Sequence, residues 1–357
     1  MPSTGGISDY ARTKAKILQN SEVELTVLRV SETRFPLLSG WLFQHSVKND
    51  YQIIEIELGA NQRRLFWAAF FLKNRIKKPL VVTIHDPGVI IDRLFRYSSL
   101  RQAPRPLPGI EDRIAKLLHS LVGEKLIDHF LRGARIIFCL NKAITEIKGN
   151  SVIYIPQPVY HNTCVPKDTS TRLRVAYLGY WSPSKGIGAL TEAFIKLVSE
   201  FPGAEFVIAG SGGGSKDTYE AHIRKLASRN GAAIQLPGFI ADNELDHFLS
   251  SLGVFILPYT ADVPGGASAM LMRAQELGTP LIVSDTPSLR AQILTDGVTF
   301  VQPNDPEKLY EAIKNVLNNY RDYLAGAAKE QQSIYVMHGW DTFREAYVTE
   351  LHNKGVL

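Results

Sequence analysis

The stretch that decides the fold runs from Gly253 to Asp285 and reads GVFILPYTADVPGGASAMLMRAQELGTPLIVSD. Its apolar run, Val254 to Pro258, predicts a buried strand. A loop carrying Gly265 and Gly266 follows, and the pattern beyond it predicts a helix over Ala267–Leu277. Backbone N–H groups at the positive end of such a helix can bind an anion. The stretch therefore predicts a strand, a glycine loop and a helix, with an anion site at the loop; a glycine-softened loop without a ligand is the alternative.

Short β-branched runs alternate with helical stretches on both sides of this unit. Such runs are nearly continuous in Val, Ile and Leu because strands of a parallel sheet are buried on both faces. The expected strands are Val23–Val30, Tyr51–Leu58, Leu80–Ile84, Ile136–Leu140, Val152–Ile155, Val175–Leu178, Glu205–Ala209, Ile234–Leu236, Val254–Leu257, Leu281–Val283 and Thr299–Val301. The expected helices of the second half are Ile187–Glu200, Asp217–Asn230, Asp242–Ser250 and Pro306–Asn318. This order predicts an α/β protein with two doubly wound, Rossmann-like domains.

The length of 357 residues suits two domains. A segment rich in Pro, Thr and Asn, Pro156–Thr171, reads as the linker. We expect an N-terminal domain over 1–165, a C-terminal domain over 170–335 and a closing helix over 336–357. In the N-terminal domain, Gly5 and Gly6 occupy the place of the turn that follows the first strand of such a sheet, yet no strand precedes them. Either the chain starts upstream of Met1, which we favour, or the sheet lacks its first strand.

Charge divides the chain into two different halves. Through Arg172 there are 25 Lys and Arg against 15 Asp and Glu, whereas the remainder has 15 against 20. A basic half can face anionic lipid, a phosphorylated substrate or nucleic acid, but no motif for reading nucleic acid accompanies the charge. No apolar run is long enough for a transmembrane helix, and no secretory signal opens the chain. We therefore expect a cytoplasmic protein, with peripheral contact at the inner face of the membrane left open. Two cysteines in dissimilar settings argue against a disulfide framework or a zinc site.

Two further segments combine glycine with the ends of expected strands. In RVAYLGYWSPSKG, Arg174 to Gly186, Lys185 follows a strand and precedes a helix, where it can meet a phosphate; a surface lysine beside a capping residue is the alternative. In AGSGGGS, Ala209 to Ser215, Gly210 and Gly212 allow either close approach of a ligand or a tight turn. The spacing matches neither GxGxxG nor GxxxxGK[ST], which argues against a dehydrogenase or a P-loop ATPase.

These motifs together resemble the retaining glycosyltransferases of the GT-B fold, family 4. The resemblance covers nearly the whole chain and is strongest over 174–303. Its matches are Gly5-Gly6-Ile7, VVTIHD with His85, the pair Lys185-Gly186, Gly238-Phe239 with Glu244-Leu245, and Ala274 with Gly278-Thr279-Pro280. The family's arginine before the lysine is Tyr180 here, and its two glutamates are Gly265 and Arg273. We expect Arg273 to move toward the phosphates and partly replace the missing cation.

The resemblance implies transfer of a sugar from a nucleoside diphosphate sugar to an acceptor, with retention, on two domains that face a central cleft. It implies His85 and Lys185 as catalytic residues, Lys185 neutralising the leaving diphosphate. The implied nucleotide-sugar site holds Gly5, Gly6, Gly179, Tyr180, Gly210, Gly212, Phe239, Gly265, Gly266, Ala267, Ser268 and Arg273. No cofactor and no metal are expected. The nucleotide base and the sugar stay open.

The acceptor side is expected in the basic half. A saccharide or lipid-linked acceptor in polysaccharide, glycolipid or glycoconjugate synthesis fits the resemblance. Asn61–Lys78, NQRRLFWAAFFLKNRIKK, combines six cations with four aromatics and no acid, and either rests on anionic lipid or packs its aromatics into the core. A non-catalytic GT-B partner subunit is a second hypothesis, because Tyr180, Gly265 and Arg273 depart from the donor-site pattern. An epimerase or phosphorylase on the same fold is weaker, since neither acidic residues at the glycine loop nor a lysine for pyridoxal phosphate can be identified.

Overall fold

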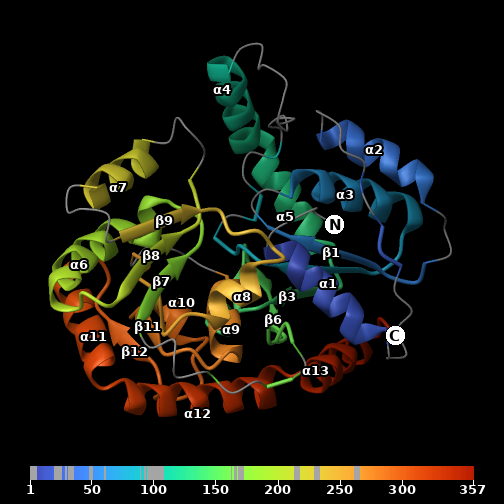
Figure 1. Ribbon diagram of the computed structural model, residues 1–357. Helices are drawn as coiled ribbons and strands as arrows, with labels where there is room; N and C mark the ends of the chain where they lie inside the picture. Colours follow the sequence, from blue (N-terminus) through green and yellow to red (C-terminus); the bar gives the residue numbers. More distant parts are fainter. Residues whose placement is uncertain are drawn as a thin grey trace. The chain divides into compact units, whose positions relative to one another are not determined.

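The computed structural model contains two units, each built around its own parallel sheet (Figure 1). It describes residues 6–19, 26–28, 30, 36–47, 51–59, 62–88, 90–91, 94, 108–161, 163–164, 167, 173–212, 218–228, 234–260 and 266–357. The first unit comprises 1–158, 264–267 and 340–357, and the second comprises 159–263 and 268–339. The chain thus leaves the first unit after Pro158, contributes the short segment 264–267 to it, and returns to it at Trp340. The alternating pattern predicted an α/β protein with parallel sheets, and this prediction is confirmed; the strand order reverses in the second unit's sheet and follows the chain in the first.

The sheet of the first unit has four strands in the order β1 (Ile54–Leu58), β2 (Leu80–Ile84), β3 (Ile136–Cys139) and β6 (Ile153–Tyr154), all parallel. Alternate residues of a strand point to opposite faces. Ile54, Ile56 and Leu58 of β1 pack on the face covered by α3 (Arg63–Ile76) and α5 (Glu124–Arg132). On the other face, the β2 residue Val81 packs with side chains of α1 (Gly6–Leu18) and α13 (Trp340–Asn353).

The remaining elements of the first unit were less apparent in the sequence. They are α2 (Pro36–Ser46), α4 (Pro108–Leu118), the π-helical turn η1 (His119–Gly123) and a small hairpin of β4 (Glu146–Ile147) and β5 (Asn150–Ser151). The strand predicted over Val23–Val30 is wrong for the residues described there, 26–28 and 30, which lie outside any strand. Val27 is exposed while Leu28 packs against the core. The alternation of apolar residues therefore reflects the packing of an irregular segment and not a β-strand.

The sheet of the second unit has six parallel strands in the order β12-β11-β10-β7-β8-β9. Their bounds are β7 Arg174–Leu178, β8 Glu205–Ala209, β9 Ile234–Gly238, β10 Val254–Leu257, β11 Leu281–Ser284 and β12 Thr299–Val301. The helices are η3 (Pro183–Lys185, a 3₁₀ turn), α6 (Ile187–Glu200), α7 (Thr218–Ser228), α8 (Leu245–Ser250), α9 (Ala269–Glu276), α10 (Pro287–Arg290), α11 (Pro306–Asn318) and α12 (Tyr320–His338). All six predicted strands of this half are confirmed to within a residue or two.

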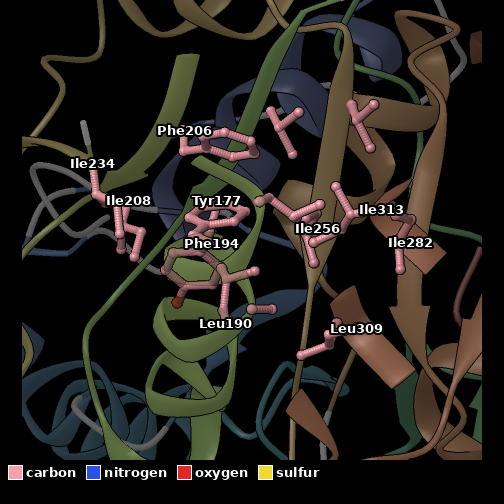
Figure 2. Packing of buried hydrophobic residues seen from close by; sticks show 14 of the residues in the cluster. Tyr177, Leu190, Phe194, Phe206, Ile208, Ile234, Ile256, Ile282, Leu309 and Ile313 are labelled. Atoms are coloured by element: carbon pink, nitrogen blue, oxygen red, sulfur yellow. The ribbon is translucent and has the colours of Figure 1, made fainter. Parts of the chain in front are cut away.

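Aromatic and branched side chains fill both faces of the second sheet. On one face, Tyr177 and Phe206 of the sheet pack with Phe194 of α6 and Ile313 of α11, as Figure 2 shows. The other face is covered by α8 and α9 through residues such as Phe248 and Leu271. Strand order changes direction between β7 and β10, because β8 and β9 lie on one side of β7 and β10 to β12 on the other. In doubly wound sheets, ligands bind outside the carboxyl ends of the strands at this switch point.

Candidate functional site

The loop that carries Lys185 lies at the switch point of the second unit. Thr260, which follows β10, donates its backbone N–H to the carbonyl oxygen of Ser184 at 3.0 Å. The ammonium of Lys185 lies 3.7 Å from the ring centroid of Tyr259, a cation–π contact. The loop after β7 is therefore tied to the end of β10, and Lys185 is held where two adjacent strands end.

Gly186 explains why the loop can come so close to β10. It has a φ of +64°, and a Cβ built on it would lie 1.7 Å from the carbonyl oxygen of Pro258. Only glycine satisfies both the left-handed backbone and this distance. Gly186 then starts α6, so Lys185 sits at the junction of the 3₁₀ turn and the helix.

Ser268 joins the same site from the other side of Tyr259. Its hydroxyl oxygen is 3.4 Å from the Tyr259 hydroxyl and accepts the N–H of Leu271, which caps α9. The helix expected from Ala267 begins at Ala269 because this cap sets its start. The structure thus brings Lys185, Tyr259 and Ser268 together, and Tyr259 is a residue that the sequence motifs did not single out.

The other glycines predicted for this unit bring the ends of β7, β8 and β9 together. Gly210 has a φ of +104°, and a Cβ on it would lie 1.8 Å from the carbonyl oxygen of Gly179. Gly210 also donates its N–H to Gly238 at 2.7 Å. The N–H of Gly212 is donated to the Glu220 carboxylate at 2.8 Å. In this structure, Gly179 and Gly210 therefore allow tight strand ends, and the Gly212 amide has a protein partner.

Two aromatic residues predicted to contact the nucleotide are exposed. Tyr180 is 59% exposed, and its carbonyl oxygen accepts the hydroxyl of Tyr177 at 3.0 Å. Phe239, which follows β9, is 71% exposed. Both side chains are open to solvent, and their contact with the nucleotide stays a prediction.

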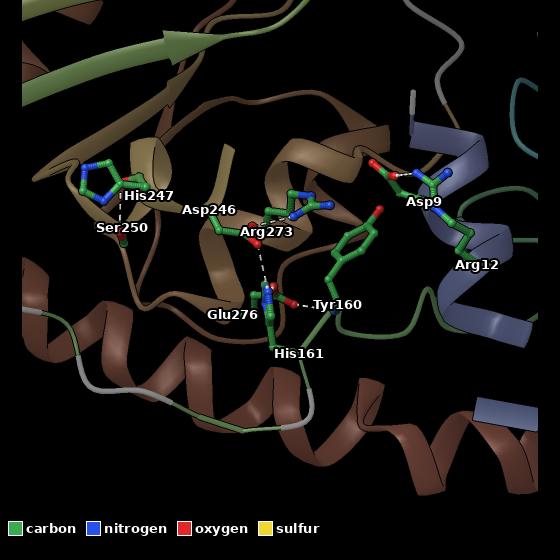
Figure 3. A network of polar contacts seen from close by, with 9 residues as sticks. All are labelled: Asp9, Arg12, Tyr160, His161, Asp246, His247, Ser250, Arg273 and Glu276. Atoms are coloured by element: carbon green, nitrogen blue, oxygen red, sulfur yellow. Dashed lines mark hydrogen bonds and ion pairs between the residues drawn. The ribbon is translucent and has the colours of Figure 1, made fainter. Parts of the chain in front are cut away.

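Arg273 lies in a network of buried and half-buried charges (Figure 3). Its guanidinium binds Asp246 at 2.7 Å and stacks over the ring of Tyr160 at 4.0 Å. Glu276, which is 1% exposed, accepts the N–H of Tyr160 and binds His161, both at 2.6 Å. The hydrogen bond to Glu276 raises the pKa of His161. Arg273 is thus paired with Asp246 in this structure, a partner that lies 27 positions away in the sequence and has no local signal.

His85 directly follows β2 in the first unit. Its ring nitrogen Nε2 lies 2.8 Å from the Glu57 carboxylate, and its ring packs edge-on against Tyr10 with centroids 4.9 Å apart. A Cβ on Gly266 would lie 1.6 Å from the His85 carbonyl oxygen, so a glycine is required there. Asn141, after β3, approaches the Gly266 carbonyl oxygen with its side-chain amide at 3.5 Å. The ends of β2 and β3 therefore carry His85 and one residue of the glycine loop.

Four predicted site residues fall elsewhere. Gly5 and Gly265 lie outside the described residues. Gly6 is the first residue of α1, and Ala267 packs with the first unit. Among the residues described, no group of three or more His, Cys, Asp or Glu side chains could hold a metal ion. Metal-free transfer stays a prediction.

Comparison with known proteins agrees with this fold. The family model "Glycosyl transferases group 1" matches residues 166–331, which span the second unit's sheet and Lys185. The second unit carries a group 1 glycosyltransferase domain. Curated proteins similar to this chain are named as glycosyltransferases.

The curated relatives differ in how much they cover. A 2-deoxystreptamine N-acetyl-D-glucosaminyltransferase from Niallia circulans is 23% identical over 291 residues, 78% of this chain and 70% of that protein. A phosphatidyl-myo-inositol mannosyltransferase from Mycobacterium tuberculosis is 32% identical over 142 residues, 39% of this chain. The match to the mannosyltransferase spans 35% of that protein's length.

Solved structures resemble the chain over almost its full length. A sucrose-phosphate synthase from Thermosynechococcus elongatus has a TM-score of 0.70 at 15% identity, and the match covers 98% of this chain and 94% of the synthase chain. Anabaena HepE in complex with UDP-glucose has a TM-score of 0.67 at 13% identity, and the match covers 99% of this chain and 98% of the HepE chain. At these identities the likeness shows the fold, and that fold is GT-B.

Proposed function

We propose that this chain transfers a sugar from a nucleoside diphosphate sugar to a saccharide or lipid-linked acceptor, with retention and without a metal. The observation that carries the proposal is the placement of Lys185. Its ammonium is held over Tyr259, beside the Ser268-capped start of α9, at the switch point of a doubly wound sheet. A fixed cation there neutralises the charge that grows on a leaving diphosphate without reorganisation.

Relatives and neighbours indicate which donors to try first. The Niallia circulans relative is named for N-acetyl-D-glucosaminyl transfer, and the Anabaena structure holds UDP-glucose. UDP-glucose and UDP-N-acetylglucosamine are therefore the first donors, followed by GDP-mannose. His85, at the end of β2, would hydrogen-bond the transferred sugar.

The experiment that tests this function measures nucleoside diphosphate release from each donor with a mixed saccharide and lipid acceptor extract. We expect release with at least one donor and a fall of about 100-fold in kcat/KM for Lys185→Ala, the size found for removal of one charge-stabilising donor. Lys225→Ala is the matched control, because Lys225 is an exposed lysine on α7. Equal losses in the two variants would contradict the role of Lys185.

A second candidate, a non-catalytic binding subunit, is favoured by one observation: Arg273, expected to reach the phosphates, is paired with Asp246. In that case a cooperatively folded protein would bind no donor and release no diphosphate. Ligand-dependent melting separates the two, because a donor that binds only the native state raises the melting temperature.

We also propose peripheral contact with an anionic membrane through the first unit. Phe66 and Trp67 of α3 are buried, so the aromatics of Asn61–Lys78 serve the core. Exposed apolar side chains lie instead on α4 and η1, where Ile114, Leu117, Leu118, Leu121 and Val122 recur at helical spacing. No helix among the described residues is long and apolar enough to span a bilayer.

Binding to vesicles tests the contact. Lipid vesicles containing phosphatidylglycerol should sediment the protein, and Leu117→Asp together with Leu121→Asp should reduce the bound fraction several-fold, because charges oppose insertion of an apolar face. Neutral vesicles and a Val336→Asp variant, which changes an exposed apolar residue of α12, are the controls. Equal binding by the double variant and the wild type would contradict the assignment.

A further inference from the structure

A buried charge cluster lies directly behind His85 in the first unit. Lys14 of α1 is 3% exposed and binds two carboxylates of strand β1, Glu55 and Glu57, the latter at 3.0 Å. Both glutamate side chains point to the same face of the sheet because they are two residues apart on a strand. The Lys14 ammonium also lies 4.4 Å from the ring centroid of Tyr347 on α13.

Only one of the two glutamates reaches the histidine. The second oxygen of Glu57 lies 2.8 Å from Nε2 of His85, whereas Glu55 binds Lys14 without touching the ring. Burial opposes the charge of Glu57, yet Lys14 and His85 together hold its pKa below the ordinary value. Burial raises the pKa of Glu55. The lowered pKa of Glu57 favours its ionised form, and an ionised carboxylate is an acceptor only.

The contact decides which nitrogen of the ring carries the proton. Since the Glu57 carboxylate can only accept, Nε2 must donate, and in the neutral ring the other nitrogen, Nδ1, is then an acceptor. Nδ1 makes no hydrogen bond to the residues that the structure describes. The His85 side chain retains 10% of its exposure, and Tyr10 packs against one edge of the ring.

We infer that Glu57 is a positioning residue for sugar transfer, which holds His85 in the Nε2–H tautomer so that Nδ1 accepts a hydroxyl of the donor sugar. Lys14 supports this arrangement by keeping Glu57 charged in a buried site. The inference rests on the proposed function, in which His85 contacts the transferred sugar. It adds a residue that no motif of the sequence indicated, because Glu57 and His85 meet only through the pairing of β1 with β2.

Nitrogen-15 NMR of histidine-labelled protein tests the tautomer without any substrate. We expect the His85 resonances of the wild type to show Nε2–H and Nδ1 without a proton, and Glu57→Gln to shift them toward a mixture, because an amide can also donate. Glu55→Gln is the matched control: it removes one Lys14 carboxylate from the same strand and should leave the His85 pattern unchanged. An Nδ1–H tautomer in the wild type, or the same spectrum for Glu57→Gln, would overturn the inference.

A kinetic cycle tests the consequence for transfer. Loss of a hydrogen bond to a charged partner predicts a fall of about ten-fold in kcat/KM for Glu57→Gln. In a His85→Ala background the same substitution should change kcat/KM by less than about two-fold, since Glu57 acts through the ring. If Glu57→Gln lowers kcat/KM by the same factor in the His85→Ala background as in the wild type, Glu57 acts by a route other than His85. Absence of turnover with every donor would instead count against the proposed function, and the tautomer measurement would still decide the contact.

Discussion

Replacement of Gly186 by alanine isolates the contact that brings the Lys185 loop to β10. The new methyl group would start 1.7 Å from the Pro258 carbonyl oxygen, at a φ of +64°. The left-handed backbone costs about 1–2 kcal/mol for a residue with a Cβ. Pushing the loop away from Pro258 costs about 1–3 kcal/mol more, as overpacking does elsewhere. We therefore expect Gly186→Ala to lower the free energy of unfolding by about 2–5 kcal/mol.

Two other glycines of the second unit separate these contributions. Gly238 has a φ of +81° but nothing within 4 Å of a built Cβ, so Gly238→Ala should cost only the backbone part, about 1–2 kcal/mol. Gly188, in α6, has open space and no positive φ, so Gly188→Ala should stabilise the unit by about 0.5–1 kcal/mol. The difference between Gly186→Ala and Gly238→Ala measures the steric contact alone.

Urea unfolding followed by fluorine NMR of fluorotryptophan-labelled protein reports the second unit separately. Trp181 is buried in that unit, whereas the other three of the four tryptophans, Trp41, Trp67 and Trp340, belong to the first. The order of midpoints at the Trp181 resonance should be Gly188→Ala, wild type, Gly238→Ala and then Gly186→Ala. Equal midpoints for the Gly186 and Gly238 variants would refute the close approach of the loop to β10.

Three further predictions concern the second unit. Protonated His161 is stabilised chiefly by Glu276, so its contribution to stability is complete below the ordinary pKa of 6.5 and is lost as pH rises through the raised pKa of the folded state. Over that pH range the urea midpoint of the wild type should fall more than the midpoint of His161→Gln. Parallel curves of midpoint against pH for the two proteins would contradict this prediction. Arg273→Ala should weaken nucleotide binding measured by calorimetry if the guanidinium leaves Asp246 when the donor binds, and an unchanged affinity would show that it serves only the network of Figure 3. Ser268→Ala should destabilise the unit by about 1 kcal/mol through loss of the α9 cap, while Ser268→Thr retains most of the stability; equal unfolding free energies for the two would argue against the cap.

Much of the second unit could be predicted because its strands are continuous apolar runs. The runs at Val254–Leu257 and Glu205–Ala209 coincide with β10 and β8, and α11 has the bounds that its proline start and amphipathic pattern predict. The small hairpin of β4 and β5 could not be foreseen, since each strand has two residues. Its turn depends on positive φ at Lys148 and Gly149, and lysine gives no signal for that conformation.

The site was only partly visible in the sequence for a related reason. Lys185 and Gly186 form a local motif, and a local motif can be recognised without the fold. Tyr259 beside Lys185, Asp246 beside Arg273 and Glu57 beside His85 are tertiary pairs, which the sheet order and helix packing create. The sequence also could not show that the apolar face of α4 is exposed, because apolar residues have the same helical spacing on a buried face and on an exposed one.

The measurement that tests the central claim most directly is the affinity of the purified protein for nucleoside diphosphates, by calorimetry, for the wild type, Lys185→Ala and Lys225→Ala. We predict that one nucleotide binds the wild type and Lys225→Ala equally. We expect Lys185→Ala to bind that nucleotide about 10- to 100-fold more weakly, the range for loss of a charged hydrogen bond. Equal binding by all three proteins would contradict the placement of the diphosphate at Lys185, and no binding of any nucleotide would contradict the donor site itself.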